Sequence, residues 1–386
     1  MESFPTFKAM TTFPARIVLP LLALSLGLIS CSKKQEPGIP VGEFYSLTGV
    51  QAVFGQSNDK GVKLALEKIN ASGGVLGQPL RVITKDNQSK QGETSTVVRE
   101  LITRDKVVAL IGEYVSGRSL EAAPIAQRSG IPMISSGSTN EKVTEVGDHI
   151  FRVCFIDPFQ GKVCAKFAHK LGATKAALLV DVSKDYSIGL TKSFKNEFEA
   201  EGGTIVGQQS YSGGDKDFSA QLTAIKADNP QVIFLPAYYT EAPLIIRQAR
   251  QLGITVPFIG GDGWDSPELV QVGGDAVEGC YFSNHFSNQS TEPKVVAFVQ
   301  NYRKKYGEDP DAGVALGYDA LSLLADAMTR AGTTDPAKVT AALAATKDFP
   351  GITGMITLDE HRNPNKSAVI LQVKNGKFSY VESVAP

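Results

Sequence analysis

The chain has 386 residues, of which 42% are apolar and 20% are charged, and its formal net charge is −1. This length favours two domains of roughly 150 residues each, and the apolar content is ordinary for a globular protein. The balanced charge offers no basic surface of the kind that nucleic-acid-binding proteins use.

The first element is an apolar run from Ile17 to Leu28, preceded by basic residues and followed closely by Cys31. This pattern is typical of a secretory signal peptide, and the run is shorter than the roughly 20 residues that span a bilayer. A cysteine at this junction resembles the bacterial lipoprotein signal, in which the cysteine carries lipid. We predict a signal peptide over residues 1–30 and a tether over residues 31–40, anchored to a bacterial membrane outside the cytoplasm. An ordinary signal peptide and a buried helix are the alternatives.

After the tether, apolar runs alternate with segments of helical spacing. In residues 59–70 the apolar positions follow the i, i+3, i+4, i+7 pattern of an amphipathic helix. Continuous apolar strands between amphipathic helices predict an α/β fold with parallel sheets covered on both faces. The mainly helical segment near residues 288–346 is expected to pack on one of the two domains. Residues 355–358 and 368–373 predict a hairpin around Asn363-Pro364-Asn365.

Ligands bind at the carboxyl ends of strands in such sheets. The strand at 107–111 is followed by Tyr114 and Ser116, and the strand at 131–134 by the hydroxyl-rich loop 135–140. Such loops at helix N-termini supply hydroxyl and backbone N–H groups that suit a carboxylate. A simple helix cap is the alternative for each loop.

The second half of the chain offers complementary groups after its own strands. Asp262 lies among glycines two residues before Trp264, and Tyr238 and Tyr239 follow the strand at 232–235. Asp262 suits a cationic group, and an Asx-turn is its alternative. The tyrosines could equally be core or rim residues. A carboxylate receptor on one domain and an ammonium receptor on the other predict an α-amino acid held between them.

Enzyme and metal motifs are missing from the sequence. It has no Gly-x-Ser-x-Gly elbow, no phosphate loop and no dinucleotide glycine pattern. The four histidines are scattered and lack metal-ligand spacing, so we predict no metal and no cofactor. They are His149, His169, His285 and His361. Beyond Cys31 three cysteines remain, Cys154, Cys164 and Cys280, and a bridge between Cys154 and Cys164 is an alternative to buried thiols.

Several stretches, in order, resemble the periplasmic branched-chain amino-acid-binding proteins, the type I solute-binding components of ABC uptake transporters. They include SLTGVQAVFGQ, IGEYVSG, GIPMISSGSTN, GGDGWDSPEL and EDPDAGVALGYDAL. The resemblance implies two doubly wound parallel-sheet lobes, joined by three hinge crossovers around a ligand cleft. It implies an N-terminal lobe of residues 41–157 and 287–348, and a C-terminal lobe of residues 158–286 and 349–386.

The resemblance also implies roles for single residues. The ligand carboxylate is expected at Ser116 and Thr139 and at the backbone of Gly137 and Ser138. The ammonium is expected at Asp262, the Gly137 carbonyl and the Thr139 hydroxyl. Family members commonly carry Glu at the position of Asp262. The residues expected to line the cleft are Phe54, Tyr186 and Tyr238, with the bulky Tyr114 and Trp264 as further candidates.

These features together predict an extracytoplasmic lipoprotein that is not an enzyme. We expect it to capture a branched-chain or other apolar amino acid and to deliver it to an ABC permease. One alternative is a ligand-sensing subunit for signalling. Another is a binding protein for an amide, a urea-like molecule or an aromatic compound.

Overall fold

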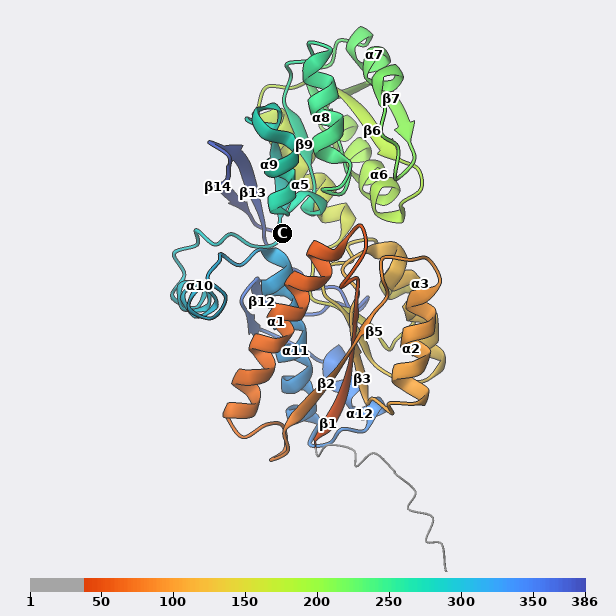
Figure 1. The fold of residues 1–386 in the computed structure, drawn as a ribbon, viewed down its shortest axis with the longest axis vertical. Coiled ribbons are helices and arrows are strands. Elements are labelled where there is room, and N and C mark those ends of the chain that lie inside the picture. Colours follow the sequence, from red (N-terminus) through yellow and green to blue (C-terminus); the bar gives the residue numbers. More distant parts are fainter. Residues whose placement is uncertain (1–37) are drawn as a thin grey trace, which may run out of the picture. The chain divides into compact units, whose positions relative to one another are not determined.

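The computed structural model describes residues 38–386. The predicted signal peptide and Cys31 lie outside the described residues. Two sheets, each with its own helices, form two α/β lobes (Figure 1). Within residues 38–386 no helix has both the length and the apolarity needed to cross a membrane.

The first lobe contains a parallel sheet of five strands in the order β2-β1-β3-β4-β5. The strands are β1 (Ile39–Tyr45), β2 (Leu80–Asp86), β3 (Ala109–Ile111), β4 (Met133–Ser135) and β5 (Ile150–Arg152). The helices are α1 (Ala52–Ala71), α2 (Glu93–Thr103), α3 (Ser116–Arg128), α4 (Lys142–Glu145), α10 (Pro293–Tyr306), α11 (Ala312–Ala331) and α12 (Pro336–Ala344). Although far from α1 in sequence, α11 (blue) packs alongside it (orange) in Figure 1.

Neighbouring residues of the central strands contribute to different cores, because side chains alternate along a strand. In β3, Ala109 and Ile111 join the core that contains α1 and α11. Leu110 joins the core that contains α2 and α3. Both faces of the sheet are therefore covered, as the continuous apolar strands predicted.

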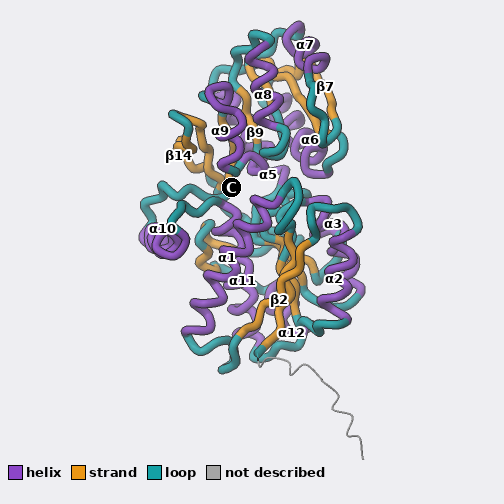
Figure 2. The backbone as a smooth tube through the Cα atoms, viewed as in Figure 1, coloured by secondary structure: helices purple, strands orange, loops and turns teal. Residues whose placement is uncertain are grey.

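The second lobe contains seven strands in the order β14-β13-β10-β9-β8-β6-β7, of which β6 to β10 are parallel. The strands are β6 (Lys175–Asp181), β7 (Thr204–Tyr211), β8 (Val232–Phe234), β9 (Phe258–Gly260), β10 (Tyr281–Asn284), β13 (Ala368–Lys374) and β14 (Lys377–Val384). The helices are α5 (Asp157–Lys170), α6 (Asp185–Ala200), α7 (Ser219–Ala227), α8 (Ala242–Gln251) and α9 (Pro267–Gly273), with the short turns η1 (Asp262–Trp264) and η2 (Gly274–Val277). Figure 2 shows strands of this lobe in orange with helices in purple around them.

The C-terminal hairpin differs from the prediction. Strand β13 pairs antiparallel with β14 on one side and with β10 on the other. Asn375 and Gly376 form the turn with φ of 52° and 69°, the left-handed pair that two-residue hairpin turns favour. The predicted pairing of residues 355–358 with 368–373 is wrong, because both edges of β13 are already occupied.

The preceding short hairpin belongs to the first lobe. It consists of β11 (Phe349–Gly351) and β12 (Gly354–Ile356). The Asp319 carboxylate of α11 accepts hydrogen bonds from the amides of Ile352 and Thr353 at 2.7 and 2.9 Å. The predicted assignment of all of residues 349–386 to the C-terminal lobe is therefore wrong for this hairpin.

Three segments of the described chain connect the lobes: 153–156, 285–292 and 357–367. The ammonium group of Lys366, in the third segment, donates a hydrogen bond of 3.0 Å to the carbonyl of Val153, in the first. Two of the connections thus lie side by side. We propose that the three segments form the hinge.

Candidate ligand-binding site

Two loops of the first lobe meet where their strands end. Ser116 begins α3, and residues 136–140 follow β4. The Ser138 hydroxyl contacts the carbonyls of Glu113 and Tyr114, both at 3.1 Å, and therefore ties the two loops together. The Asn140 amide donates to the Ser116 hydroxyl at 3.4 Å. The loops predicted from the strand ends are thus brought into one place, beside the N-terminus of α3.

The hydroxyl group of Thr139 is buried, and it has no hydrogen-bond partner. Its backbone carbonyl accepts a bond of 2.9 Å from the amide of Asp157, the first residue of α5. The loop after β4 therefore contacts the start of the second lobe directly.

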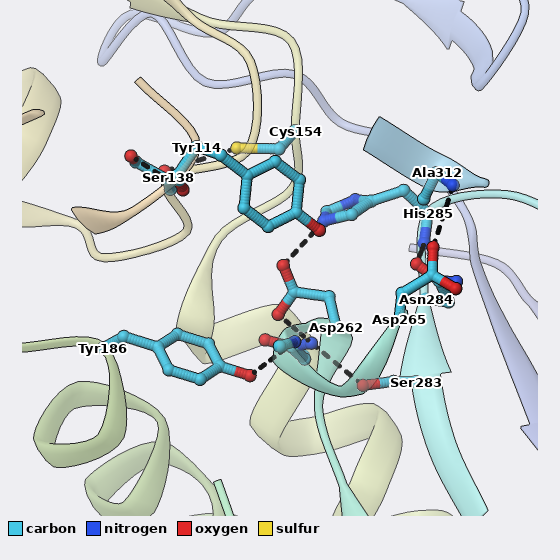
Figure 3. Close-up of polar contacts among 12 residues, drawn as sticks. Tyr114, Ser138, Cys154, Tyr186, Asp262, Asp265, Ser283, Asn284, His285 and Ala312 are labelled. Carbon is cyan, nitrogen blue, oxygen red and sulfur yellow. Dashed lines mark hydrogen bonds and ion pairs between the residues drawn. The ribbon is translucent and has the colours of Figure 1, made fainter. Parts of the chain in front are cut away.

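Asp262 carries the charge that the second lobe presents (Figure 3). It begins η1, two residues after the end of β9, and is 1% exposed. Its Oδ1 accepts a hydrogen bond of 2.8 Å from the Gln160 side chain, and its Oδ2 lies 3.2 Å from His285 Nε2. The Tyr186 hydroxyl accepts a bond of 3.2 Å from the amide of Gly263, the residue that follows. The Tyr186 side chain, which comes from α6, therefore meets Asp262 at the η1 turn.

Aromatic rings from both lobes surround this place. Phe54 stacks on Tyr114 in the first lobe, with 4.4 Å between ring centres, and Tyr186 stacks on Tyr238 in the second, at 5.0 Å. The two pairs meet where Phe54 packs edge-on against Tyr238, at 5.9 Å. A β-carbon at Gly137 would lie 2.4 Å from the Tyr114 ring, so this glycine makes room for it.

Buried polar atoms without partners concentrate around these residues. Buried polar groups in folded proteins are almost always hydrogen-bonded, so such a cluster needs an explanation. The atoms are Tyr114 Oη, Thr139 Oγ1, both carboxylate oxygens of Asp157, Gln160 Oε1 and His285 Nδ1. Burial and the nearby charge of Asp262 raise the pKa of Asp157 to about 8, and the neighbouring Thr139 hydroxyl only partly offsets this. A ligand rich in N–H donors would satisfy several of these acceptors at once.

The sequence predictions omitted Asp157, Gln160 and His285. The signal for Asp157 and His285 was present, since they lie just beyond β5 and β10, where the strand-end rule also applies. Gln160 lies one helical turn after Asp157 in α5. No local pattern could indicate that the scattered His285 would reach Asp262.

Trp264 does not face the aromatic cluster. Its indole N–H donates to the carbonyl of Leu235 at 3.1 Å, and its ring lies against Gly260 and near Phe282, in the core of the second lobe. The prediction that Trp264 lines the site is therefore wrong, because η1 turns this side chain back onto its own sheet.

The cysteines of the described chain, Cys154, Cys164 and Cys280, are buried free thiols, so no bridge joins Cys154 to Cys164. Burial raises the pKa of Cys154 and of Cys164 to about 12. Within residues 38–386 no group of three or more acidic, histidine or cysteine side chains is arranged to hold a metal.

Contacts between the lobes surround the site. The Asn140 side chain of the first lobe donates to the carbonyl of Asp185 in the second at 2.8 Å. Asp265, just after η1, accepts a bond of 2.8 Å from the amide of Ala312 at the start of α11. These bonds link the two lobes around the candidate site.

A cavity of about 550 Å³ lies on another side of the lobe junction. Residues of α1, of the 284–289 segment and of the β13–β14 turn line it, and so do Asp265 and Asp311. None of the predicted ligand-contacting residues does. The cavity is therefore separate from the candidate site.

The model of the periplasmic binding protein family matches residues 38–377. The chain belongs to the periplasmic binding protein family. It is 30% identical over 351 residues to the Leu/Ile/Val-binding protein homolog 1 of Brucella abortus strain 2308, covering 89% of this chain and 92% of the relative.

Solved structures of periplasmic binding proteins share this fold. A leucine-binding protein from Thermotoga maritima is 40% identical, with a TM-score of 0.87 over 90% of this chain and 99% of that one. A branched-chain amino acid transporter substrate-binding protein from Streptococcus pneumoniae, in complex with isoleucine, is 37% identical, with a TM-score of 0.85 over 90% of this chain and 100% of that one. The type I periplasmic binding protein fold predicted from the sequence is thus confirmed, and these relatives are binding proteins rather than enzymes.

Proposed function

We propose that this chain is the substrate-binding component of an ABC transporter for branched-chain amino acids. The observation that carries the proposal is the pairing of unlike receptors across the lobes. The first lobe offers hydroxyl groups beside a helix N-terminus, and the second offers the Asp262 carboxylate. The names of the relatives from Thermotoga maritima and Streptococcus pneumoniae support a leucine- or isoleucine-like ligand.

The ligand carboxylate would bind at the start of α3. Ser116 supplies a hydroxyl group there, and the positive end of the helix dipole favours an anion. The free hydroxyl group of Thr139 and the backbone of Gly137 and Ser138 complete the proposed receptor. The buried Arg152 guanidinium bonds the carbonyls of Ser138 and Asn140, on either side of Thr139, but among the hydrogen bonds of the described chain none joins a lysine or arginine to the Ser116 or Thr139 side chain. Hydrogen bonds and the helix dipole would therefore carry the interaction, with Arg152 holding the loop.

The ligand ammonium would bind between Asp262 and the Thr139 hydroxyl, with the Gly137 carbonyl as a further acceptor. The two unpartnered oxygens of Asp157 support a second acidic contact. A bound ammonium would favour the ionised form of Asp157 and would thus lower its raised pKa.

The ligand side chain would pack among Phe54, Tyr114, Tyr186 and Tyr238, whose rings are all buried. Large apolar surfaces of this kind suit an aliphatic side chain. The unpartnered hydroxyl group of Tyr114 favours a second candidate, an amino acid whose side chain carries one polar atom.

Binding can be tested by thermal shift and calorimetry on the chain from residue 38 onward, with each of the twenty amino acids. A ligand at 100 times its Kd should stabilise the protein by about 2.7 kcal/mol. We expect leucine, isoleucine or valine to give the largest shift. A largest shift with a polar amino acid would favour the second candidate, and no shift with any of the twenty would contradict the proposal.

Anchoring and delivery need their own test. We propose that lipid on Cys31 holds the protein at a membrane, near its permease. Cys31→Ser should then move the full chain from the membrane fraction to the soluble extracytoplasmic fraction and reduce uptake of labelled ligand by cells. Unchanged fractionation would exclude the lipid anchor.

A further inference from the structure

The Asp262 carboxylate is held from two directions by side chains of the protein itself. The Gln160 side-chain amide donates to Oδ1 at 2.8 Å and contacts the Ser283 hydroxyl at 3.0 Å. On the other side, His285 Nε2 lies 3.2 Å from Oδ2. Gln160 comes from α5, and His285 comes from the proposed hinge segment after β10. All of these side chains are buried.

The lowered pKa of His285 favours the neutral ring, which can donate to Asp262 through Nε2. Burial lowers the pKa of His285, and the contact with Asp262 only partly offsets this. A neutral imidazole carries one N–H, and the hydrogen bond to Asp262 places it on Nε2. The ring of Phe155 covers the imidazole with 3.7 Å between centres, which fixes its orientation. The positive charge of Lys366 lowers the pKa of His285 further and so disfavours a second proton on the ring.

These two contacts fix the orientation of the Asp262 carboxylate, whose side chain is one methylene shorter than that of glutamate. One donor on each oxygen stops rotation of the carboxylate about its last bond. Because both donors are neutral, they leave the negative charge of the carboxylate available to the ligand. An arginine or lysine partner would offset that charge. Preorganised groups bind more tightly because less freedom is lost on binding.

We infer that Gln160 and His285 are positioning residues that turn the short Asp262 into a selective receptor for the ligand ammonium. The inference rests on the proposed function, since it concerns the same site. It goes further by assigning the selectivity for an amine to two residues that need not touch the ligand.

The test compares leucine with 4-methylpentanoate, the same molecule without its amine. Gln160→Met and His285→Phe keep the shape but remove the donor. Each should weaken leucine binding about 10-fold or more, the range expected for a hydrogen bond to a charged group. Binding of 4-methylpentanoate should change less than about 3-fold, because its carboxylate lies at the other lobe.

Two further variants separate positioning from packing. His285→Gln returns an N–H donor near the Nε2 position and should recover most of the leucine affinity that His285→Phe loses. Ser283→Ala removes the other contact of the Gln160 amide but leaves its bond to Asp262, so it should keep the preference for leucine. The melting temperature without ligand shows whether each variant folds.

The pH dependence gives a second measurement that packing alone would not move. In acid, a second proton on His285 would place a cation beside the ammonium, so leucine affinity should fall as the pH drops through the pKa of His285. Asp262, Asp157, Lys366 and Tyr114 also face this region, so the wild-type profile is compared with that of His285→Gln, which lacks this titration.

The outcomes separate the two proposals. If the wild type binds neither leucine nor any other amino acid, the proposed function fails. If the wild type binds leucine but Gln160→Met and His285→Phe weaken leucine and 4-methylpentanoate equally, the positioning role is excluded and the proposed function stands. Identical pH profiles of the wild type and His285→Gln would also count against it.

Discussion

The hydroxyl group of Tyr239 lies 3.1 Å from the carbonyl oxygen of Val50, so a side chain of the second lobe bonds the backbone of the first. The same hydroxyl accepts a bond of 3.3 Å from the amide of Val53, in the first turn of α1. The ring of Phe54 packs edge-on against Tyr239 at 4.8 Å. Tyr239, which follows Tyr238 in the sequence, thus links the two lobes although we assign it no contact with the ligand.

Tyr239→Phe should speed ligand release. Loss of the two hydrogen bonds should destabilise the state in which the lobes touch by about 1–3 kcal/mol, because each net bond is worth about 0.5–1.5 kcal/mol. We expect a faster dissociation rate for leucine and a nearly unchanged association rate in stopped-flow measurements. Tyr281→Phe is a matched control, since that hydroxyl bonds Gln372 within the second lobe. Equal dissociation rates in the two variants would contradict the role of Tyr239 as a link between lobes.

Asp262→Asn should weaken leucine far more than 4-methylpentanoate. The substitution removes the negative charge while it keeps the size of the side chain, so only the ligand with an ammonium loses an ionic partner. Asn140→Ala serves as a control that breaks an interlobe bond, and both ligands should then weaken alike. Equal loss of both ligands in Asp262→Asn would exclude the ammonium role.

Gly137→Ala should disturb the site through Tyr114, because the new methyl group would lie 2.4 Å from the ring. Overpacking of this kind costs about 1–3 kcal/mol. The cost should appear in the free energy of unfolding or in ligand affinity. Tyr114→Leu in the same chain should relieve it, which a double-mutant cycle would measure as a favourable coupling. Additive effects would show that the two positions are independent.

Asp157 should make the ligand-free protein less stable as the pH rises. Its pKa is raised to about 8 by burial and by Asp262, whereas an aspartate in an unfolded chain has a pKa of about 3.9. The folded state therefore holds a proton that the unfolded state gives up, so stability is full below about pH 4 and is lost as the pH rises towards 8. Asp157→Asn should reduce this loss by at least about 1 kcal/mol between pH 5 and pH 8 in urea unfolding.

Glu43 provides the comparison for that measurement. Burial also raises its pKa to about 8, but it lies within β1 and bonds Thr84. Glu43→Gln should flatten the pH dependence in the same direction. Saturating leucine should remove the contribution of Asp157, because the ammonium favours its ionised form, and should leave that of Glu43. If leucine affects both contributions alike, Asp157 does not meet the ligand.

The strand-end rule accounts for most of what the sequence could predict. Ser116, the loop at 136–140 and Asp262 all follow buried strands, and parallel strands bring their carboxyl ends to one edge. The partners of Asp262 could not be predicted, because Gln160 and His285 come from separate elements that meet only after the second lobe has folded. The direction of Trp264 likewise depends on the path of η1 and not on its distance from Asp262 in the sequence. The β13–β14 turn carried a local signal, Asn375-Gly376, that the predicted hairpin overlooked.

The bond between Asp265 and the amide of Ala312 gives η1 a second role. Asp262 and Asp265 stand at the two ends of one short turn, so the proposed ammonium receptor and a contact to the opposite lobe share a single rigid piece of backbone. A displacement of Asp262 on ligand binding should therefore also move Asp265. We expect amide hydrogen exchange at Ala312 to slow when ligand binds. The exchange rate at the start of α11, in the opposite lobe, would then report whether the site is occupied.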